Sequence, residues 1–165
     1  MMSETYVECL VKKKTSPLLL LLKMVCIMLT VVLILVGFVF WPALIAGVLF
    51  GVASYFLSMN SNLEYEYLYL DKEITIDKVM ARTKRKRVAK YDLERMEILA
   101  PLRSYHLDDY KNRTVKTCDY SSGEENQPDF RYAMYYDGST KVILEPNMDM
   151  VKAIKNIAPR KVYMD

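Results

Sequence analysis

The feature that most constrains the fold is a long stretch without charge. Residues 24–59 contain no Asp, Glu, Lys or Arg, although charged residues make up 26% of the whole chain. One membrane-spanning helix needs about 20 apolar residues, and the apolar stretch from residue 16 to residue 60 is roughly twice that long. The soluble-looking average composition therefore hides two unlike parts.

The sequence Phe-Trp-Pro at residues 40–42 divides this stretch into two. Proline begins helices well and interrupts them badly, and tryptophan favours the membrane interface. We therefore predict one helix at residues 18–40 and a second at residues 42–59, joined tightly into an antiparallel hairpin. A cleaved signal peptide is disfavoured, because the apolar part is too long and no small-residue cleavage site follows a short apolar core.

Basic residues near the ends of the hairpin predict its orientation. Lys12, Lys13 and Lys14 precede the first helix, a basic run at residues 82–87 follows the second, and the turn between the helices has no basic residue. Because Lys and Arg favour the cytoplasmic side, we expect a two-pass protein of the cell (cytoplasmic) membrane with both termini in the cytoplasm. The chain would then comprise a cytoplasmic N-terminal segment (1–17), the transmembrane hairpin (18–59) and a cytoplasmic domain (60–165).

Small residues recur every four positions on the second helix, at Ala43, Gly47 and Gly51. Such a stripe allows another helix to approach closely. The approaching helix is either the first helix of the same chain or a second copy of the chain in a homo-oligomer. The hairpin contains no Asp, Glu, His or Arg, and since transporters usually place such residues at membrane depth, transport is disfavoured.

The domain after the hairpin has the alternation of β-strands. The segment Leu-Glu-Tyr-Glu-Tyr-Leu-Tyr-Leu at 63–70 puts Tyr65, Tyr67 and Tyr69 on one face. A turn at Asp71–Glu73 and the segment 74–80 complete a predicted hairpin. The three tyrosines are interpreted as a packed sheet face, because a base-stacking platform needs basic neighbours and the neighbours here are glutamates.

Further strands and one helix are predicted towards the C-terminus. Residues 130–136 and 141–144 flank an Asp-Gly turn and form a second hairpin, and residues 114–120 form an isolated strand. Asn147 is a good N-cap and Pro159 a stop for a C-terminal amphipathic helix. The predicted class is therefore α+β, with the helical hairpin followed by a mostly antiparallel β domain and one closing helix.

This order of elements resembles the bacterial pleckstrin-homology-like (PH-like) domains of small membrane proteins, over roughly residues 63–158. The whole chain also resembles an uncharacterised family of small two-helix membrane proteins from anaerobic Gram-positive bacteria. The segments that carry this resemblance are residues 74–80, Lys-Tyr-Asp-Leu from residue 90, Asp-Tyr-Ser-Ser-Gly from residue 119, and the ending Glu-Pro-Asn followed by Ala-Pro-Arg-Lys-Val. Because that family has a domain of unknown function, the resemblance implies an architecture and a location but no activity.

The basic run Arg-Thr-Lys-Arg-Lys-Arg contains no apolar residue on either face of a strand. We therefore predict an exposed hairpin tip or strand end. The run either helps to keep the domain inside the cell or contacts anionic phospholipid, since each nearby basic residue gains about 1 kcal/mol at the negative cytoplasmic leaflet. The residues of this candidate lipid contact are Arg82, Lys84, Arg85, Lys86, Arg87 and Lys90.

The pattern of reactive residues disfavours catalysis. The single histidine, His106, lies in a polar segment, and the three cysteines share no metal-ligand spacing. No glycine-rich phosphate loop occurs in the domain. We therefore expect no enzyme activity, no cofactor and no metal, with reduced cysteines and a solvated His106. The net charge of +3 is too mild for a nucleic-acid-binding domain.

These features predict a membrane-tethered interaction or assembly module, with a protein partner or a homo-oligomer. The alternative is an anionic-lipid sensor that uses the basic segment 82–90. A small holin-like pore former is a second alternative, suggested by the tight two-helix hairpin.

Overall fold

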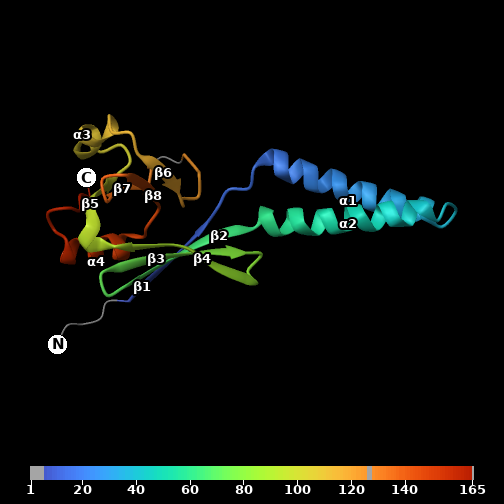
Figure 1. The fold of residues 1–165 in the computed structure, drawn as a ribbon, viewed down its shortest axis with the longest axis horizontal. Helices are drawn as coiled ribbons and strands as arrows, with labels where there is room; N and C mark the ends of the chain where they lie inside the picture. The colour runs from blue at the N-terminus through green and yellow to red at the C-terminus, as the bar shows by residue number, and fades with distance from the viewer. Residues whose placement is uncertain (1–5, 126–127, 165) are drawn as a thin grey trace. The chain divides into compact units, whose positions relative to one another are not determined.

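The computed structural model describes residues 6–125 and 128–164. They form two compact units, whose elements are labelled in Figure 1. The hairpin unit contains residues 14–63 and 80–84, and the β domain contains the residues up to Lys13, residues 64–79 and the residues from Arg85 onwards. The predicted class is confirmed: two long apolar helices are followed by mostly antiparallel sheets and a C-terminal helix.

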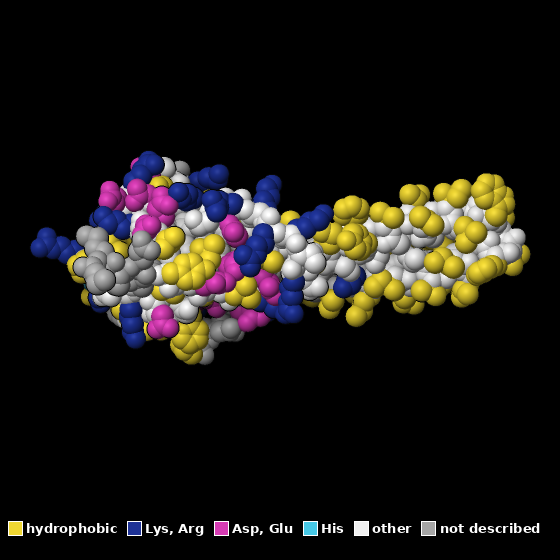
Figure 2. All heavy atoms as spheres, turned by 90° about the horizontal axis from the view of Figure 1, so that it is seen from below, with side chains coloured by type: hydrophobic (Ala, Val, Ile, Leu, Met, Phe, Trp, Pro, Cys, Tyr) yellow, Lys and Arg dark blue, Asp and Glu magenta, His cyan; other side chains and the backbone are white. Residues whose placement is uncertain are grey.

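The hairpin consists of α1 (Pro17–Gly37) and α2 (Pro42–Ser61). Each helix begins at a proline, whose fixed φ suits the first helical turn. The first helix ends at Gly37 and not at Phe40 as predicted, because residues 38–41 form the turn. Both helices are long and apolar enough to cross a membrane. Most of their large apolar side chains are exposed, as the yellow surface of the helices in Figure 2 shows.

The first sheet has the order β1-β2-β3-β4. Its strands are β1 (Val7–Lys12), β2 (Leu63–Leu70), β3 (Glu73–Met80) and β4 (Lys84–Asp92). The sequence analysis predicted the β2–β3 hairpin but not β1, which it placed in a separate N-terminal segment (1–17). In the structure β1 pairs antiparallel with β2, with Cys9 opposite Tyr67. The two paired strands lie on either side of the helical hairpin in the sequence.

Two tight turns connect the later strands of this sheet. Asp71 and Lys72 have φ of 48° and 64°, and Ala81 and Arg82 have φ of 49° and 57°. Two successive residues with positive φ give the twist that joins antiparallel strands by a two-residue turn. Asp tolerates this conformation, whereas Ala and Arg adopt it rarely. The turn at Ala81 and Arg82, where the basic run begins, is therefore the more strained of the two.

The second sheet has the order β5-β7-β8-β6. Its strands are β5 (Met96–Pro101), β6 (Lys116–Asp119), β7 (Tyr132–Tyr136) and β8 (Thr140–Leu144). The predicted second hairpin is present, and Asp137 and Gly138 at its turn both have positive φ. The predicted strand within 114–120 is also present, and it pairs parallel with β8 while the other pairs are antiparallel.

The C-terminal helix α4 (Met148–Ile157) is capped by Asn147, whose side chain accepts a hydrogen bond of 2.9 Å from the Met150 amide. The helical spacing of Met148, Val151, Ile154 and Ala158 predicts that they line the buried face, with Met150 and Ile157 at its margin. The structure reverses this assignment, since Met150 is buried and Met148 is half exposed. The difference arises because Met148 is the first residue of the helix, where it projects beyond the sheet-facing side.

The main core lies between the two sheets and α4. Tyr65, Tyr67 and Tyr69 are buried in it, which confirms their interpretation as a packed sheet face. A smaller cluster covers the other side of the second sheet and includes Ile98, Leu107 and Tyr135. Leu107 ends a short 3-10 helix (Tyr105–Leu107), and α3 (Asp108–Lys111) follows directly. The first part of the long segment 102–129 therefore covers a sheet face. A further 3-10 helix (Leu93–Arg95) joins the two sheets in the sequence, and Asp92 caps it by accepting a hydrogen bond of 2.8 Å from the Glu94 amide.

Candidate functional site

The basic run occupies the turn before β4 and the first half of that strand, and residues 84–88 are exposed. The predicted exposed strand end is thus observed. The run is divided between the two units, because Arg82 and Lys84 belong to the hairpin unit, and Arg85, Lys86, Arg87 and Lys90 belong to the β domain.

Acidic residues of the same sheet neutralise part of the run. Arg85 Nη2 lies 3.0 Å from Glu66 Oε1, Arg87 Nε lies 3.7 Å from Asp77 Oδ1, and Lys90 Nζ lies 2.7 Å from Glu73 Oε2. No acidic residue pairs with Lys84 or Lys86 within residues 6–125 and 128–164. The free positive charge at this strand is therefore smaller than the sequence suggests.

Glu66 is an unusual member of this group, because its side chain is 1% exposed and its Oε2 has no hydrogen-bond partner in the described chain. Burial raises the pKa of Glu66, and the neighbouring carboxyl group of Glu8 raises it further. The interaction with Glu66 lowers the pKa of Glu8. The two neighbouring carboxyl groups are therefore shifted in opposite directions, Glu66 towards its neutral form and Glu8 towards its charged form.

The small-residue stripe of α2 faces α1 of the same chain. A Cβ on Gly47 would lie 3.3 Å from an Ile34 side-chain atom, and one on Gly51 would lie 3.5 Å from the Thr30 side chain. Ala43 is also buried. The first of the two predicted alternatives, packing within the hairpin, is therefore the one that the structure contains.

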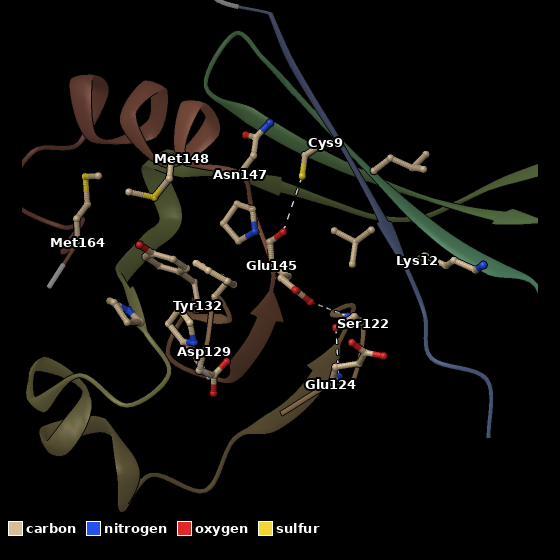
Figure 3. Close-up of a pocket in the computed structure, with 16 residues that line it drawn as sticks. Cys9, Lys12, Ser122, Glu124, Asp129, Tyr132, Glu145, Asn147, Met148 and Met164 are labelled. Carbon is tan, nitrogen blue, oxygen red and sulfur yellow. Dashed lines mark hydrogen bonds between the residues drawn. The ribbon is translucent and has the colours of Figure 1, made fainter. Parts of the chain in front are cut away.

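The sequence analysis missed a pocket of about 620 Å³ in the β domain, shown in Figure 3. Residues 9–12 of β1 form one wall, Pro146, Asn147 and Met148 at the start of α4 form another, and Ser122, Glu124, residues 128–130 and Tyr132 form the third. Met148 and Phe130 are 51% and 57% exposed. The pocket thus offers apolar surface that the domain leaves uncovered.

Hydrogen bonds fix the walls of this pocket. Glu145 accepts a bond of 3.0 Å from the Ser122 amide through its carboxylate, and its own amide donates to the Tyr67 hydroxyl at 3.3 Å. The Tyr67 hydroxyl in turn donates to the Tyr120 carbonyl at 2.5 Å. Asp129 is held by Arg131 through two bonds of 2.8 Å, and these bonds lower the pKa of Asp129. These hydrogen bonds hold Glu145, Ser122 and Asp129 in place in the pocket walls.

The strand β1 borders the pocket with an open edge. It is the first strand of its sheet, and no other strand of the described chain pairs with its outer edge. The Asn147 side-chain amide lies 3.5 Å from the Glu8 carbonyl oxygen, so this carbonyl points away from β2. Backbone direction alternates along an antiparallel strand. Hence the amides and carbonyls of Leu10 and Lys12 also point outwards, along the pocket wall.

A weak signal for β1 was present in the sequence. In Val-Glu-Cys-Leu-Val-Lys the residues Val7, Cys9 and Val11 alternate with Glu8, Leu10 and Lys12, as in a strand buried on one face. The pocket had no such signal, because its walls come from three distant parts of the chain.

The described residues contain no group of three His, Cys, Asp or Glu side chains arranged to hold a metal ion. His106 was expected to be solvated, but its ring stacks on Tyr163 at 3.7 Å and lies 4.0 Å from the Tyr105 ring. Its aromatic neighbours make it part of the packing that covers the second sheet. Burial raises the pKa of the Cys9 thiol, which disfavours its reactive thiolate form.

Comparison with known proteins supports the fold. The family described as bacterial PH-like domain (DUF6106) matches residues 3–164. No curated protein and no solved structure gives a significant match to the chain. The matched range includes β1 and the helical hairpin.

Proposed function

This chain belongs to the family of bacterial PH-like domains (DUF6106), and from this premise we propose that it is a non-enzymatic, membrane-tethered interaction module whose β domain binds another protein. The observation that carries the proposal is the pocket beside the open edge of β1. Concave, largely apolar sites with a few fixed polar groups are typical binding sites.

The tether in this proposal is the pair α1 and α2, inserted in the cell membrane. Support for its topology comes from the pairing of β1 with β2. These strands precede and follow the hairpin, so pairing within one domain requires both ends of the hairpin to lie on the same side. Lys12, Lys13 and Lys14 favour the cytoplasmic side, which would place both termini in the cytoplasm.

Site-specific photo-crosslinking of the full chain in native membranes tests the proposal. A photo-crosslinking amino acid at the position of Met148 lies in the pocket wall, and one at the position of Tyr105, which is 69% exposed, lies outside it. We expect a discrete crosslinked protein from position 148 and none from position 105. Recovery of monomer alone from both positions would contradict the proposal.

A second candidate function is contact with anionic phospholipid, which the exposure of Lys84 and Lys86 favours. Arg85 and Arg87 are less suitable probes, because their substitution also removes partners of Glu66 and Asp77. The informative variant is Lys84→Glu with Lys86→Glu. Its matched control is Lys152→Glu with Lys155→Glu on α4, which changes the net charge equally.

The measurement for this second candidate is hydrogen exchange of residues 82–90 in nanodiscs of neutral or partly anionic lipid. Lipid contact predicts slower exchange in anionic nanodiscs, which the Lys84 and Lys86 variant abolishes and the α4 control keeps. Equal exchange in the two lipids would exclude this function.

A further inference from the structure

We propose that the open edge of β1 binds an extended segment of a partner protein, which pairs antiparallel with β1. This segment has an acidic residue, then three apolar residues, then a basic residue. This inference rests on the proposed function and names the chemistry of the partner. Adding a strand to a free sheet edge is a recurrent form of peptide recognition, in which backbone bonds give affinity and side-chain pockets give specificity.

The outer edge of β1 carries backbone hydrogen-bonding groups. Leu10 and Lys12 direct their amides and carbonyls away from β2, which gives two donors and two acceptors at the outer edge. Outside the strand ladder, no backbone hydrogen bond is found at Leu10 or Lys12 within the described parts of the chain. Leu10 is 56% exposed, so the edge is accessible.

The exposed face of β1 has an acidic residue near one end and a basic residue at the other. Glu8, Leu10 and Lys12 lie on this face, whereas Cys9 and Val11 are buried. In an antiparallel added strand, an acidic residue would lie opposite Lys12, an apolar residue opposite Leu10, and a basic residue opposite Glu8. Opposite charges on directly paired residues stabilise a strand pair, and like charges destabilise it. These pairings set the order of charges in the partner segment.

The pocket beside β1 can accept the remaining side chains of the added strand. The residues of the added strand that lie opposite Cys9 and Val11 point to the opposite face of the sheet. On that face the pocket offers the apolar surface of Pro146, Met148 and Phe130. Apolar residues at these positions fill space that the domain itself leaves empty. The partner segment therefore needs apolar side chains on both faces between its two charged residues.

A second copy of this chain is a rival occupant, because β1 itself contains Glu8 and Lys12 in a suitable order. Antiparallel pairing of two β1 strands centred on Leu10 would place Glu8 opposite Lys12. However, the alternate residues Cys9 and Val11 are 9% and 8% exposed, since they pack in the core of their own domain. They are not available to fill the pocket of another copy. A free partner segment satisfies both the edge and the pocket.

Peptide binding to the full chain in nanodiscs tests the inference. The probe is a labelled peptide with the sequence SGEVLVKGS, and the matched control is SGKVLVEGS, which has the same composition with the charges exchanged. Fluorescence anisotropy should give saturable binding of the probe, with a dissociation constant on the order of tens of micromolar. The control should bind about tenfold more weakly, because both charge pairs become repulsive.

Two variants of the chain locate the site. Lys12→Glu should weaken binding of the probe about fivefold and should strengthen binding of SGKVLVKGS, whose first charge is then complementary. Met148→Glu should weaken binding of every peptide about fivefold, because it replaces apolar pocket wall by charge. Lys141→Glu, which is remote from β1 in the second sheet, is the control. Hydrogen exchange of β2 in each variant reports whether the domain is folded.

Several results would overturn the inference. Equal binding of the probe and the exchanged-charge peptide would show that β1 does not read the charges, and absence of binding by both would show that the edge takes no strand. A disulfide-linked dimer of Leu10→Cys chains, with Cys9, Cys26 and Cys118 replaced by Ala, would assign the edge to a second copy. If photo-crosslinking from position 148 still captures a protein while the peptides fail, this inference fails and the proposed function stands.

Discussion

The helical hairpin and the β domain are held together in different ways. Within α1 and α2 the buried residues are few and small: Cys26, Gly37, Ala43, Gly47, Ser54 and Ser61. The β domain instead buries large side chains, such as Tyr67, Ile76, Met134 and Ile154, in one continuous core. In the proposed membrane location, lipid tails would be as apolar as the helices, so the hairpin would gain from close packing. The domain gains from removing apolar surface from water.

This difference teaches where each region is sensitive. A hairpin that depends on close approach responds to added volume along one seam and tolerates change on its exposed surface. A domain that depends on burial responds to lost strands and lost hydrogen bonds in its interior. The two regions should therefore fail independently, and the following predictions test this.

The largest effect is expected from replacing β1, residues 7–12, with six Gly and Ser residues of the same total length. The change removes Cys9 and Val11 from the core and leaves β2 as an open edge. We expect the β domain to lose about 4 kcal/mol or more, seen as fast hydrogen exchange throughout β2, while the hairpin stays resistant to extraction from the membrane. A replacement that keeps the apolar alternation, Val-Gln-Val-Thr-Val-Gln, should restore protection. Slow exchange in the Gly and Ser variant would contradict the role of β1.

The next effect concerns the hydrogen bonds of Tyr67, which is fully buried. Tyr67→Phe leaves the Tyr120 carbonyl and the Glu145 amide without their shared hydroxyl. We expect a loss of about 2–3 kcal/mol of unfolding free energy, because buried polar groups lose their partner. Thermal unfolding of the β domain measures it, and Tyr105→Phe at an exposed position is the control. Equal melting temperatures for the two variants would mean that the Tyr67 hydroxyl contributes nothing.

A smaller loss of stability is expected where α1 and α2 pack against each other, and it should differ between Gly37 and Gly51. A Cβ on Gly37 would lie 2.5 Å from the Leu44 side chain and 3.1 Å from its backbone nitrogen. Gly37→Ala should therefore destabilise the hairpin by about 1–2 kcal/mol through overpacking. Gly51→Ala introduces the same methyl group at ordinary van der Waals distance, 3.5 Å from Thr30, and should be tolerated. Cysteine crosslinking between α1 and α2 in membranes compares the two, and an equal response would argue against close packing as the cause.

The smallest effect depends on pH and concerns Glu66. Its pKa is raised above the ordinary value of 4.5, so the folded state binds its proton more tightly than the unfolded state does. Stability therefore falls as pH rises from the unfolded pKa through the folded pKa. Glu66→Gln removes this dependence, so we expect its melting temperature to exceed that of the wild type by about 2–4 °C at pH 7. The difference should shrink below pH 4.5. A difference that is constant with pH would contradict the raised pKa of Glu66.

Much of the fold could be predicted because its signals are local. The apolar length of residues 18–59, the Asp-Gly turn at 137–138 and the Asn147 cap each act over a few residues, and each is found in the structure. The strand β1 was missed because its partner lies beyond the hairpin, and pairing at that separation leaves no local trace. Met148 was misplaced because helical periodicity does not describe the first residue of a helix well.

The candidate site was harder to predict, for physical reasons. The run of basic residues is obvious in the sequence, but the acids that pair with Arg85, Arg87 and Lys90 lie on neighbouring strands. The pocket depends on three segments that meet only after the sheets have formed. A sequence pattern identifies charges that lie close together along the chain, and it does not reveal which of them the sheet neutralises.

The position of β1 before the hairpin has a consequence for biosynthesis. The strand ends at Lys12 and its partner begins at Leu63, so the ribosome releases β1 well before β2 exists. During that interval the two apolar helices are synthesised while the first strand has no sheet to join. The β domain can fold only after the helices have been synthesised, and its completed sheet then links the sequences on both sides of the hairpin. Synthesis of the whole hairpin is thus a condition for a finished domain.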